Sequence, residues 1–155
     1  MHIGTNSKKF NITQEKDTKS ISEKFSEIIS KGDILCLYGN LGVGKTTFVK
    51  YLINNIQRKN KTKETEVFSP TFSIVNEYLI NDNLIYHYDL HRIKNLDELD
   101  NIDFLEDYKE SITLIEWPEL VDKKIENKID LFFEYEDNYN KRNLIIHSKN
   151  KVINL

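Results

Sequence analysis

The chain has 155 residues, of which 39% are hydrophobic and 30% charged, and its 22 basic and 25 acidic residues give a net charge of −3. This balance excludes a disordered chain, which would combine fewer apolar residues with a larger net charge. It also excludes a surface that binds polyanions generally. At roughly 150 residues per domain, the length predicts a single domain over residues 1–155.

Strand and helix patterns alternate in the first half of the chain. Residues 8–12 predict a short strand. Apolar residues then recur at helical spacing from Ile21 to Ile29, and Ser20 with Glu23 would begin that helix as a capping box.

Residues 33–38, with a continuous apolar run from Ile34 to Tyr38, predict a buried strand that is covered on both faces, as in a parallel sheet. A Gly-rich segment at residues 39–44 follows directly. Phe48, Leu52 and Ile56 lie on one helical stripe and predict a second helix after that segment.

Strand patterns dominate the second half. The predicted elements are a hairpin of strands 73–80 and 84–88, a helix over 96–108 with a break near Asp103, a buried strand over 112–115, a short helix from Pro118, and a closing strand pair over 129–135 and 144–147. This order predicts an α/β fold like that of the P-loop NTPases, with a mostly parallel central sheet, flanking helices and antiparallel edge strands.

The segment Gly39-Asn40-Leu41-Gly42-Val43-Gly44-Lys45-Thr46 matches the phosphate-binding pattern G-x-x-x-x-G-K-[ST] in full. Backbone N–H groups of such a turn point at a phosphate, and glycine adopts the angles that this requires. The N-terminus of the following helix adds positive partial charge. Lys45 would contact the β- and γ-phosphates, and the Thr46 hydroxyl would bind Mg²⁺.

Two acidic residues follow apolar strands at the sheet edge where ligands bind. Asp89 ends the strand over 84–88, and Glu116 ends the strand over 112–115. Both are therefore candidates for holding the metal or orienting the attacking water.

Other residues near these acids have open interpretations. Thr71, which follows Ser69-Pro70, could contact the γ-phosphate or the metal, or belong to an ordinary Pro turn. Trp117 could stack on a ligand or lie in the core. A structural zinc needs four ligands, so we interpret His87 as a hydrogen-bonded strand residue and not, with His91, as a metal ligand.

Two other classes of P-loop protein fit less well. Asn127-Lys128-Ile129-Asp130 matches the guanine-reading N-K-x-D pattern of GTPases, but it opens a strand instead of ending one, and no glycine follows Gly44 to form the second GTPase switch. A small-molecule kinase would close an Arg-rich lid over the transferred phosphate, whereas only Arg92 and Arg142 are arginine after residue 60.

Four motifs in this order resemble those of the bacterial TsaE family, also called YjeE. They are Gly39-Asn40-Leu41-Gly42-Val43-Gly44-Lys45-Thr46-Thr47, Ser69-Pro70-Thr71-Phe72, His87-Tyr88-Asp89-Leu90-His91-Arg92 and Ile115-Glu116-Trp117. The resemblance covers roughly residues 10–148. It implies a small P-loop ATPase required for N6-threonylcarbamoyladenosine in tRNA, with ATP and Mg²⁺ as cofactors. The implied partners are the proteins TsaD and TsaB. The chain would contact tRNA only indirectly, through the complex of these proteins.

The resemblance also implies roles for individual residues. Residues 39–47 and Trp117 would bind the nucleotide, Thr46, Asp89 and Glu116 would bind the metal, and Lys45, Thr71, Asp89 and Glu116 would act in catalysis. Asn40 and His91 depart from the family pattern, which usually has Asp and Tyr at these positions.

Two alternatives to an ATPase remain open, namely a nucleotide-gated docking module without meaningful turnover and a small-molecule kinase.

A cytoplasmic location without membrane contact is expected. The longest apolar run, Ile34 to Tyr38, is far shorter than a membrane span, the first thirty residues are polar, and Cys36 has no partner for an internal disulfide.

Overall fold

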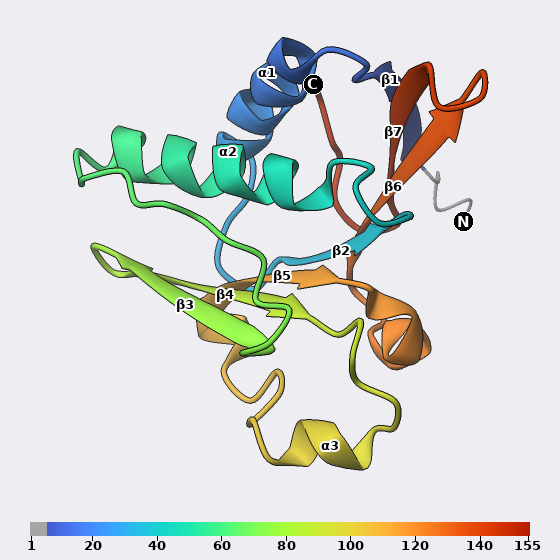
Figure 1. Cartoon of the computed structure of the whole chain (residues 1–155). Helices are drawn as coiled ribbons and strands as arrows, with labels where there is room; N and C mark the ends of the chain where they lie inside the picture. The colour runs from blue at the N-terminus through green and yellow to red at the C-terminus, as the bar shows by residue number, and fades with distance from the viewer. Residues whose placement is uncertain (1–5) are drawn as a thin grey trace.

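The computed structural model describes residues 6–155, so residues 1–5 of the predicted domain lie outside the described residues. Within that range, seven strands form one sheet (Figure 1). The elements are β1 (Asn6–Asn11), α1 (Glu15–Ser26), β2 (Ile34–Tyr38), α2 (Lys45–Lys59), β3 (Val75–Ile80), β4 (Asn83–Asp89), α3 (Asp97–Asp100), η1 (Tyr108–Glu110), β5 (Ser111–Glu116), η2 (Pro118–Leu120), η3 (Asp122–Lys124), β6 (Ile129–Glu136) and β7 (Lys141–Ser148).

The strand order in the sheet is β1-β7-β6-β2-β5-β4-β3. In the centre, β2 pairs in parallel with β5 and β6, and β4 pairs in parallel with β5. Towards the edges, β1 is antiparallel to β7, β7 to β6, and β3 to β4. The predicted α/β fold, with a mostly parallel centre and antiparallel edge strands, is confirmed.

Both faces of the sheet are covered, as the side chains of β2 illustrate. Leu35 and Leu37 belong to the core cluster beneath α1 and α2, whereas Ile34 and Cys36 belong to a second cluster on the other face. Figure 1 shows α1 and α2 together on one side of the sheet and α3 on the opposite side. Because successive side chains of a strand point to opposite faces, a strand buried on both faces reads as a continuous apolar run.

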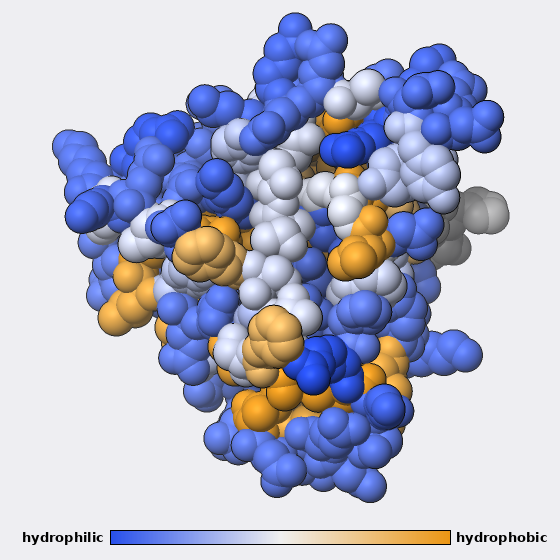
Figure 2. All heavy atoms as spheres, in the orientation of Figure 1, coloured by the Kyte–Doolittle hydropathy of each residue, from blue (hydrophilic) through white to orange (hydrophobic). Residues whose placement is uncertain are grey.

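The surface seen in Figure 2 is mostly hydrophilic, and its apolar atoms form separate patches, including one beside α3 at the bottom of the view. Among residues 6–155, none of the helices combines the length and apolar character that a membrane span needs.

Helix α1 begins at Glu15, so the predicted capping box of Ser20 and Glu23 is wrong, because both residues lie inside the helix. Its neighbours Ser22 and Ser26 are buried, and their hydroxyls donate hydrogen bonds to carbonyl groups of the preceding turn. These two buried hydroxyls are thus satisfied by the backbone of their own helix.

The predicted helix over 96–108 is also wrong in its extent. Only Asp97–Asp100 is α-helical, and the predicted break is real, because Asp103 and Leu105 have φ of +50° and +61°. A residue in the left-handed region interrupts a helix. The segment is held instead by packing, since Leu99 and Phe104 contact the second core cluster.

The parallel strands place their ends at one edge of the sheet. Glu116, the last residue of β5, is the register partner of both Leu37 in β2 and Asp89 in β4. The Gly-rich segment at residues 39–44 and both acidic residues therefore meet there. Ile129 of the N-K-x-D match pairs with Leu35 at the start of β6, which places that tetrapeptide towards the opposite edge.

Candidate functional site

The turn formed by residues 39–44 joins β2 to α2 and requires glycine at two positions. Gly39 has φ of +144°, and a Cβ there would lie 2.6 Å from the carbonyl oxygen of Phe133 in β6. Gly44 has φ of +120° with open space around it. Side chains disfavour such angles. The turn thus lies closely against β6 and leads into the N-terminus of the 15-residue helix α2, where anions are stabilised.

A cavity of about 230 Å³ lies at this turn and brings most of the predicted site residues together. From the turn and the start of α2, it is lined by Leu41, Gly42, Gly44 and residues 45–47. Thr71, Asp89, Glu116 and Trp117 complete the predicted part of the lining.

Three predicted nucleotide-binding residues do not line this cavity. Val43 is buried in the core beneath α1 and α2. Gly39 and Asn40 line a neighbouring cavity beside the β6–β7 hairpin, and Asn40 is exposed. The departure of Asn40 from the family pattern therefore leaves the side chains that line the main cavity unchanged.

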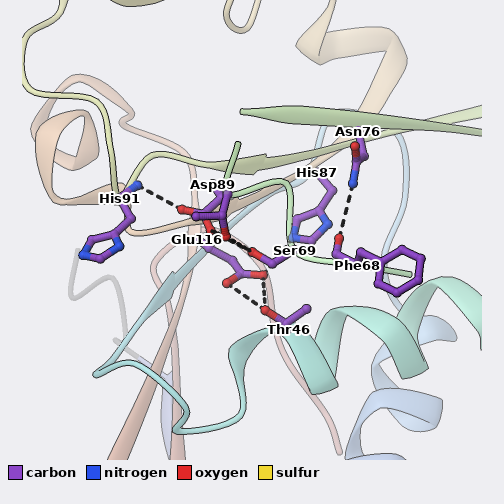
Figure 3. A network of polar contacts seen from close by, with 9 residues as sticks. Thr46, Phe68, Ser69, Asn76, His87, Asp89, His91 and Glu116 are labelled. Atoms are coloured by element: carbon purple, nitrogen blue, oxygen red, sulfur yellow. Dashed lines mark hydrogen bonds and ion pairs between the residues drawn. The ribbon is translucent and has the colours of Figure 1, made fainter. Parts of the chain in front are cut away.

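Glu116 is buried, with an exposed fraction of 2%, and connects two elements (Figure 3). Its two carboxylate oxygens lie 2.9 and 3.1 Å from the Thr46 hydroxyl, which donates from the first turn of α2. On the other side, its Oε1 lies 2.8 Å from Nε2 of the fully buried His87 in β4. The carboxylate is therefore held between α2 and the neighbouring strand β4.

Asp89 is held by a second group of hydrogen bonds, which Figure 3 shows in part. Its Oδ2 accepts from Ser69 Oγ at 2.7 Å and from Thr71 Oγ1 at 3.2 Å, and its Oδ1 accepts from the backbone N–H of His91 at 2.9 Å. These bonds fix the 69–71 segment to the end of β4, so Thr71 lies at the cavity through its contact with Asp89.

Lys45 is folded back onto the turn that precedes it. Its Nζ donates to the carbonyl groups of Gly39 and Asn40 and lies 4.1 Å from the centre of the Trp117 ring. Burial lowers the pKa of the Lys45 ammonium, while the nearby Glu116 carboxylate opposes that shift. The His91 ring stacks on Trp117 with centroids 4.3 Å apart, so this histidine supplies an aromatic plane at the position where the family usually has Tyr.

Sequence reasoning missed two features of the site. The hydrogen bond expected for His87 exists, but its partner Glu116 was not predicted, because the two residues are neighbours only through the pairing of β4 with β5. Arg142 also lines the cavity, from the antiparallel strand β7. No motif marks it, since only the fold brings β7 to this edge.

The oxygen atoms at the site fit Mg²⁺. A threonine hydroxyl and the two carboxylates of Asp89 and Glu116 line one cavity, and such oxygens are the ligands that this ion prefers. Among residues 6–155 there is no group of three or more His, Cys, Asp and Glu side chains suited to a metal ion. The two carboxylates of Asp89 and Glu116 match the one or two that Mg²⁺ usually takes, with phosphate and water completing its shell.

Comparisons with known proteins agree with this geometry. The family model described as threonylcarbamoyl adenosine biosynthesis protein TsaE matches residues 12–144. The tRNA threonylcarbamoyladenosine biosynthesis protein TsaE of Rickettsia prowazekii is 34% identical over 140 residues, which cover 90% of this chain and 94% of that protein. The protein of the same name from Aquifex aeolicus is 34% identical over 139 residues, covering 89% and 94%.

The fold is also found in solved structures. The crystal structure of YdiB from Bacillus subtilis matches with a TM-score of 0.70 and 21% identity, over 94% of this chain and 88% of that one. Together with the family model, which spans most of the sequence, these relatives show that the chain belongs to the TsaE family.

Proposed function

We propose that this chain is a Mg²⁺-dependent ATP-hydrolysing subunit required for N6-threonylcarbamoyladenosine formation in tRNA, and that it acts on a complex of TsaB and TsaD. Family membership supports the pathway. The observation that carries the ATPase assignment is the contact between Glu116 and Thr46 across the P-loop. A buried carboxylate held against the hydroxyl of a phosphate-binding helix is suited to a metal–nucleotide complex.

Each residue of the site has its own role in phosphoryl transfer. Thr46, Glu116 and Asp89 would hold Mg²⁺, which when bound neutralises charge on the β- and γ-phosphates. The backbone N–H groups of the turn and the N-terminus of α2 bind the phosphates. Glu116 and Thr71 lie where they can orient the attacking water, and Glu116 is held in place by His87.

Lys45 changes partners in this proposal. It donates to two carbonyl groups of its own turn and lies over Trp117, and a phosphate offers a stronger, charged acceptor. The ammonium therefore leaves the Trp117 ring as the nucleotide binds. Because Trp117 is the only tryptophan of the chain, its fluorescence reports this step.

ATP is favoured over GTP by the position of the N-K-x-D match, which opens β6. A guanine-reading tetrapeptide has to follow the end of a strand near the nucleotide, and this one lies towards the other edge of the sheet.

The test measures phosphate release from ATP and Mg²⁺, with and without purified TsaB–TsaD, together with ATP binding by Trp117 fluorescence. We expect TsaB–TsaD to stimulate release. Lys45→Ala should abolish release, and Glu116→Gln should lower turnover by at least about tenfold while ATP still binds. Two matched controls are Lys50→Ala, an exposed lysine of α2, and Glu126→Gln, an exposed carboxylate outside the cavity. Both should behave as the wild type.

Three results would contradict the proposal. Unchanged hydrolysis in a folded Lys45→Ala protein would remove the assigned site. ATP binding without stimulated release would favour a nucleotide-gated docking module. Phosphate recovered on an acceptor other than water would instead identify a small-molecule kinase.

A further inference from the structure

A second cavity, of about 140 Å³, lies on the sheet face away from α1 and α2. Its floor comes from strands β3, β4 and β5, and residues 102–108 cover it. It shares no lining residue with the nucleotide cavity. The covering segment is the one that was predicted to be helical and instead forms turns.

The floor of this cavity is a row of polar side chains on a sheet face that is otherwise apolar. Glu77 in β3 pairs in register with Tyr86 in β4, and Tyr86 pairs with Thr113 in β5. The rings of Tyr86 and Tyr88 stack above the sheet with centroids 6.0 Å apart. Thr113 is 1% exposed, and its Oγ1 is buried without a hydrogen-bond partner. A buried hydroxyl left unsatisfied carries a desolvation cost, so this atom is suited to a ligand that donates a hydrogen bond.

Four carboxylates line the cavity around this floor, namely those of Glu77, Asp103, Glu106 and Asp107. Among residues 6–155, none of the four forms an ion pair. The lining contains no Lys, Arg or His.

The negative charge of these carboxylates affects the pKa of the two tyrosines in the floor. Burial, with Glu77, Asp107 and Glu106 adding to it, raises the pKa of Tyr86. Burial likewise raises the pKa of Tyr88 to about 12, and Glu77 and Asp103 contribute. The cavity thus combines a negative potential with two aromatic rings and a free acceptor.

We propose that this cavity binds a guanidinium group. A metal ion held by three or more protein side chains is disfavoured, because within residues 6–155 no such group of His, Cys, Asp and Glu is arranged to hold one. A guanidinium is planar, stacks on tyrosine rings, and is less strongly hydrated than an ammonium. It also has five N–H donors in one plane for the carboxylates and Thr113 Oγ1. The cavity is several times larger than the ~30 Å³ that one water occupies in the liquid, which leaves room for such a group.

The test is an amide NMR titration of the full chain with methylguanidinium, with neutral methylurea of the same shape as the control. We expect methylguanidinium to shift the amide signals of Tyr86, Thr113 and Asp107 in a saturable way. The dissociation constant should be on the order of millimolar, since the carboxylates at the rim are exposed. Equal shifts with methylurea, or no shifts with either compound, would overturn the proposal.

Variants test which residues of the cavity bind the guanidinium. Thr113→Val keeps the side-chain shape and removes an unsatisfied hydroxyl, so the protein should fold as before and bind about threefold more weakly. The double variant Glu77→Gln/Asp107→Asn should bind more weakly by about fivefold or more, whereas Glu110→Gln, an exposed carboxylate outside the lining, should bind as the wild type. Wild-type affinity in the double variant would overturn the assignment.

Two further probes distinguish the source of the guanidinium. A capped Gly-Arg-Gly peptide represents an arginine side chain of a protein, and agmatine represents a small guanidino compound. Tighter binding of the peptide would support a protein arginine, and tighter binding of agmatine would support a small molecule. None of these measurements depends on ATP hydrolysis, so the outcome is separate from that of the proposed function.

Discussion

His87 is fully buried, yet only one of its two ring nitrogens has a partner. Nε2 lies 2.8 Å from Glu116 Oε1, while Nδ1 has no hydrogen-bond partner. An unsatisfied buried polar atom costs about 1–3 kcal/mol, so an apolar side chain here would be the more stable choice. The contact with Glu116 explains the histidine as a positioning residue, which holds the carboxylate towards Thr46.

We therefore expect His87→Phe to lower the turnover of ATP by roughly tenfold, equivalent to about 1.4 kcal/mol of the barrier, while ATP affinity changes little. His87→Gln, which keeps a donor, should recover part of the loss. The measurement is kcat from phosphate release together with Kd from Trp117 fluorescence. A purely structural role for His87 would lower the melting temperature and leave kcat per folded molecule unchanged. His147→Gln, in β7, is the matched histidine control.

Gly39 and Gly44 both have a positive φ, but their surroundings differ. Substitutions at the two positions therefore separate the effect of backbone strain from the effect of a steric clash. Gly39→Ala would place a methyl group 2.6 Å from the Phe133 carbonyl oxygen, whereas Gly44→Ala meets nothing within 4 Å. We expect Gly44→Ala to cost only the backbone strain, about 1–3 kcal/mol of unfolding free energy. Gly39→Ala should cost more, because β6 has to move. Urea unfolding of both variants checks the order, and a smaller loss for Gly39→Ala would contradict the close packing of the turn on β6.

At the scale of elements, β2, the Gly-rich turn at residues 39–44 and α2 could be predicted from sequence, because each has a local cause. The run over residues 34–38 is apolar on both faces, the glycines mark backbone angles, and the stripe through Phe48 and Leu52 has the period of a helix. These signals agree with one another, and the structure confirms all three elements.

Two predictions were wrong for different reasons. Ser20 and Glu23 have the spacing of a capping box, but α1 begins at Glu15, so both residues lie inside the helix, where they are exposed. The segment over 96–108 has the apolar residues of a helix, yet those residues serve to cover the second cluster, and turns at Asp103 and Leu105 direct them onto it. In this second case, tertiary packing overrides local propensity.

The same distinction applies to the site. Lys45, Thr46, Asp89 and Glu116 lie in motifs or directly after strands, so position in the sequence identifies them. Arg142 reaches the cavity only because β7 is antiparallel to β6 and begins at the edge where β2 ends. Such a residue cannot be found without the topology.

At the scale of the whole molecule, the two faces of the sheet differ in what they bury. The buried members of the cluster beneath α1 and α2 are aliphatic and phenylalanine side chains, and its tyrosines are only partly buried, whereas the buried members of the other cluster include Cys36 and Tyr88, two groups that can ionise. Burial raises the pKa of the Cys36 thiol from 9.0 to about 12 and that of the Tyr88 hydroxyl from 10.0 to about 12. The second face should therefore be the one that is sensitive to alkali.

The sign of this effect follows from linkage. Below pH 9 both groups are protonated in the folded and the unfolded chain, so their full contribution to stability is present. As the pH rises from 9 to 12, the unfolded chain loses these protons first, and the free energy of unfolding falls. For Tyr88, which is 2% exposed, two pKa units correspond to a loss of about 2–3 kcal/mol.

Urea unfolding between pH 8 and pH 12 checks this prediction at the level of one group. In Tyr88→Phe the ring still packs against Phe104 but cannot ionise, so the fall between pH 10 and 12 should be smaller than in the wild type by about 2–3 kcal/mol. The fall between pH 9 and 10, which we attribute to Cys36, should remain. Tyr139→Phe, which alters a tyrosine that is 73% exposed, should follow the wild type throughout. An equally steep fall in Tyr88→Phe would show that this hydroxyl is not desolvated, and that residues 101–107 do not close over the second face as tightly as the packing of Phe104 requires.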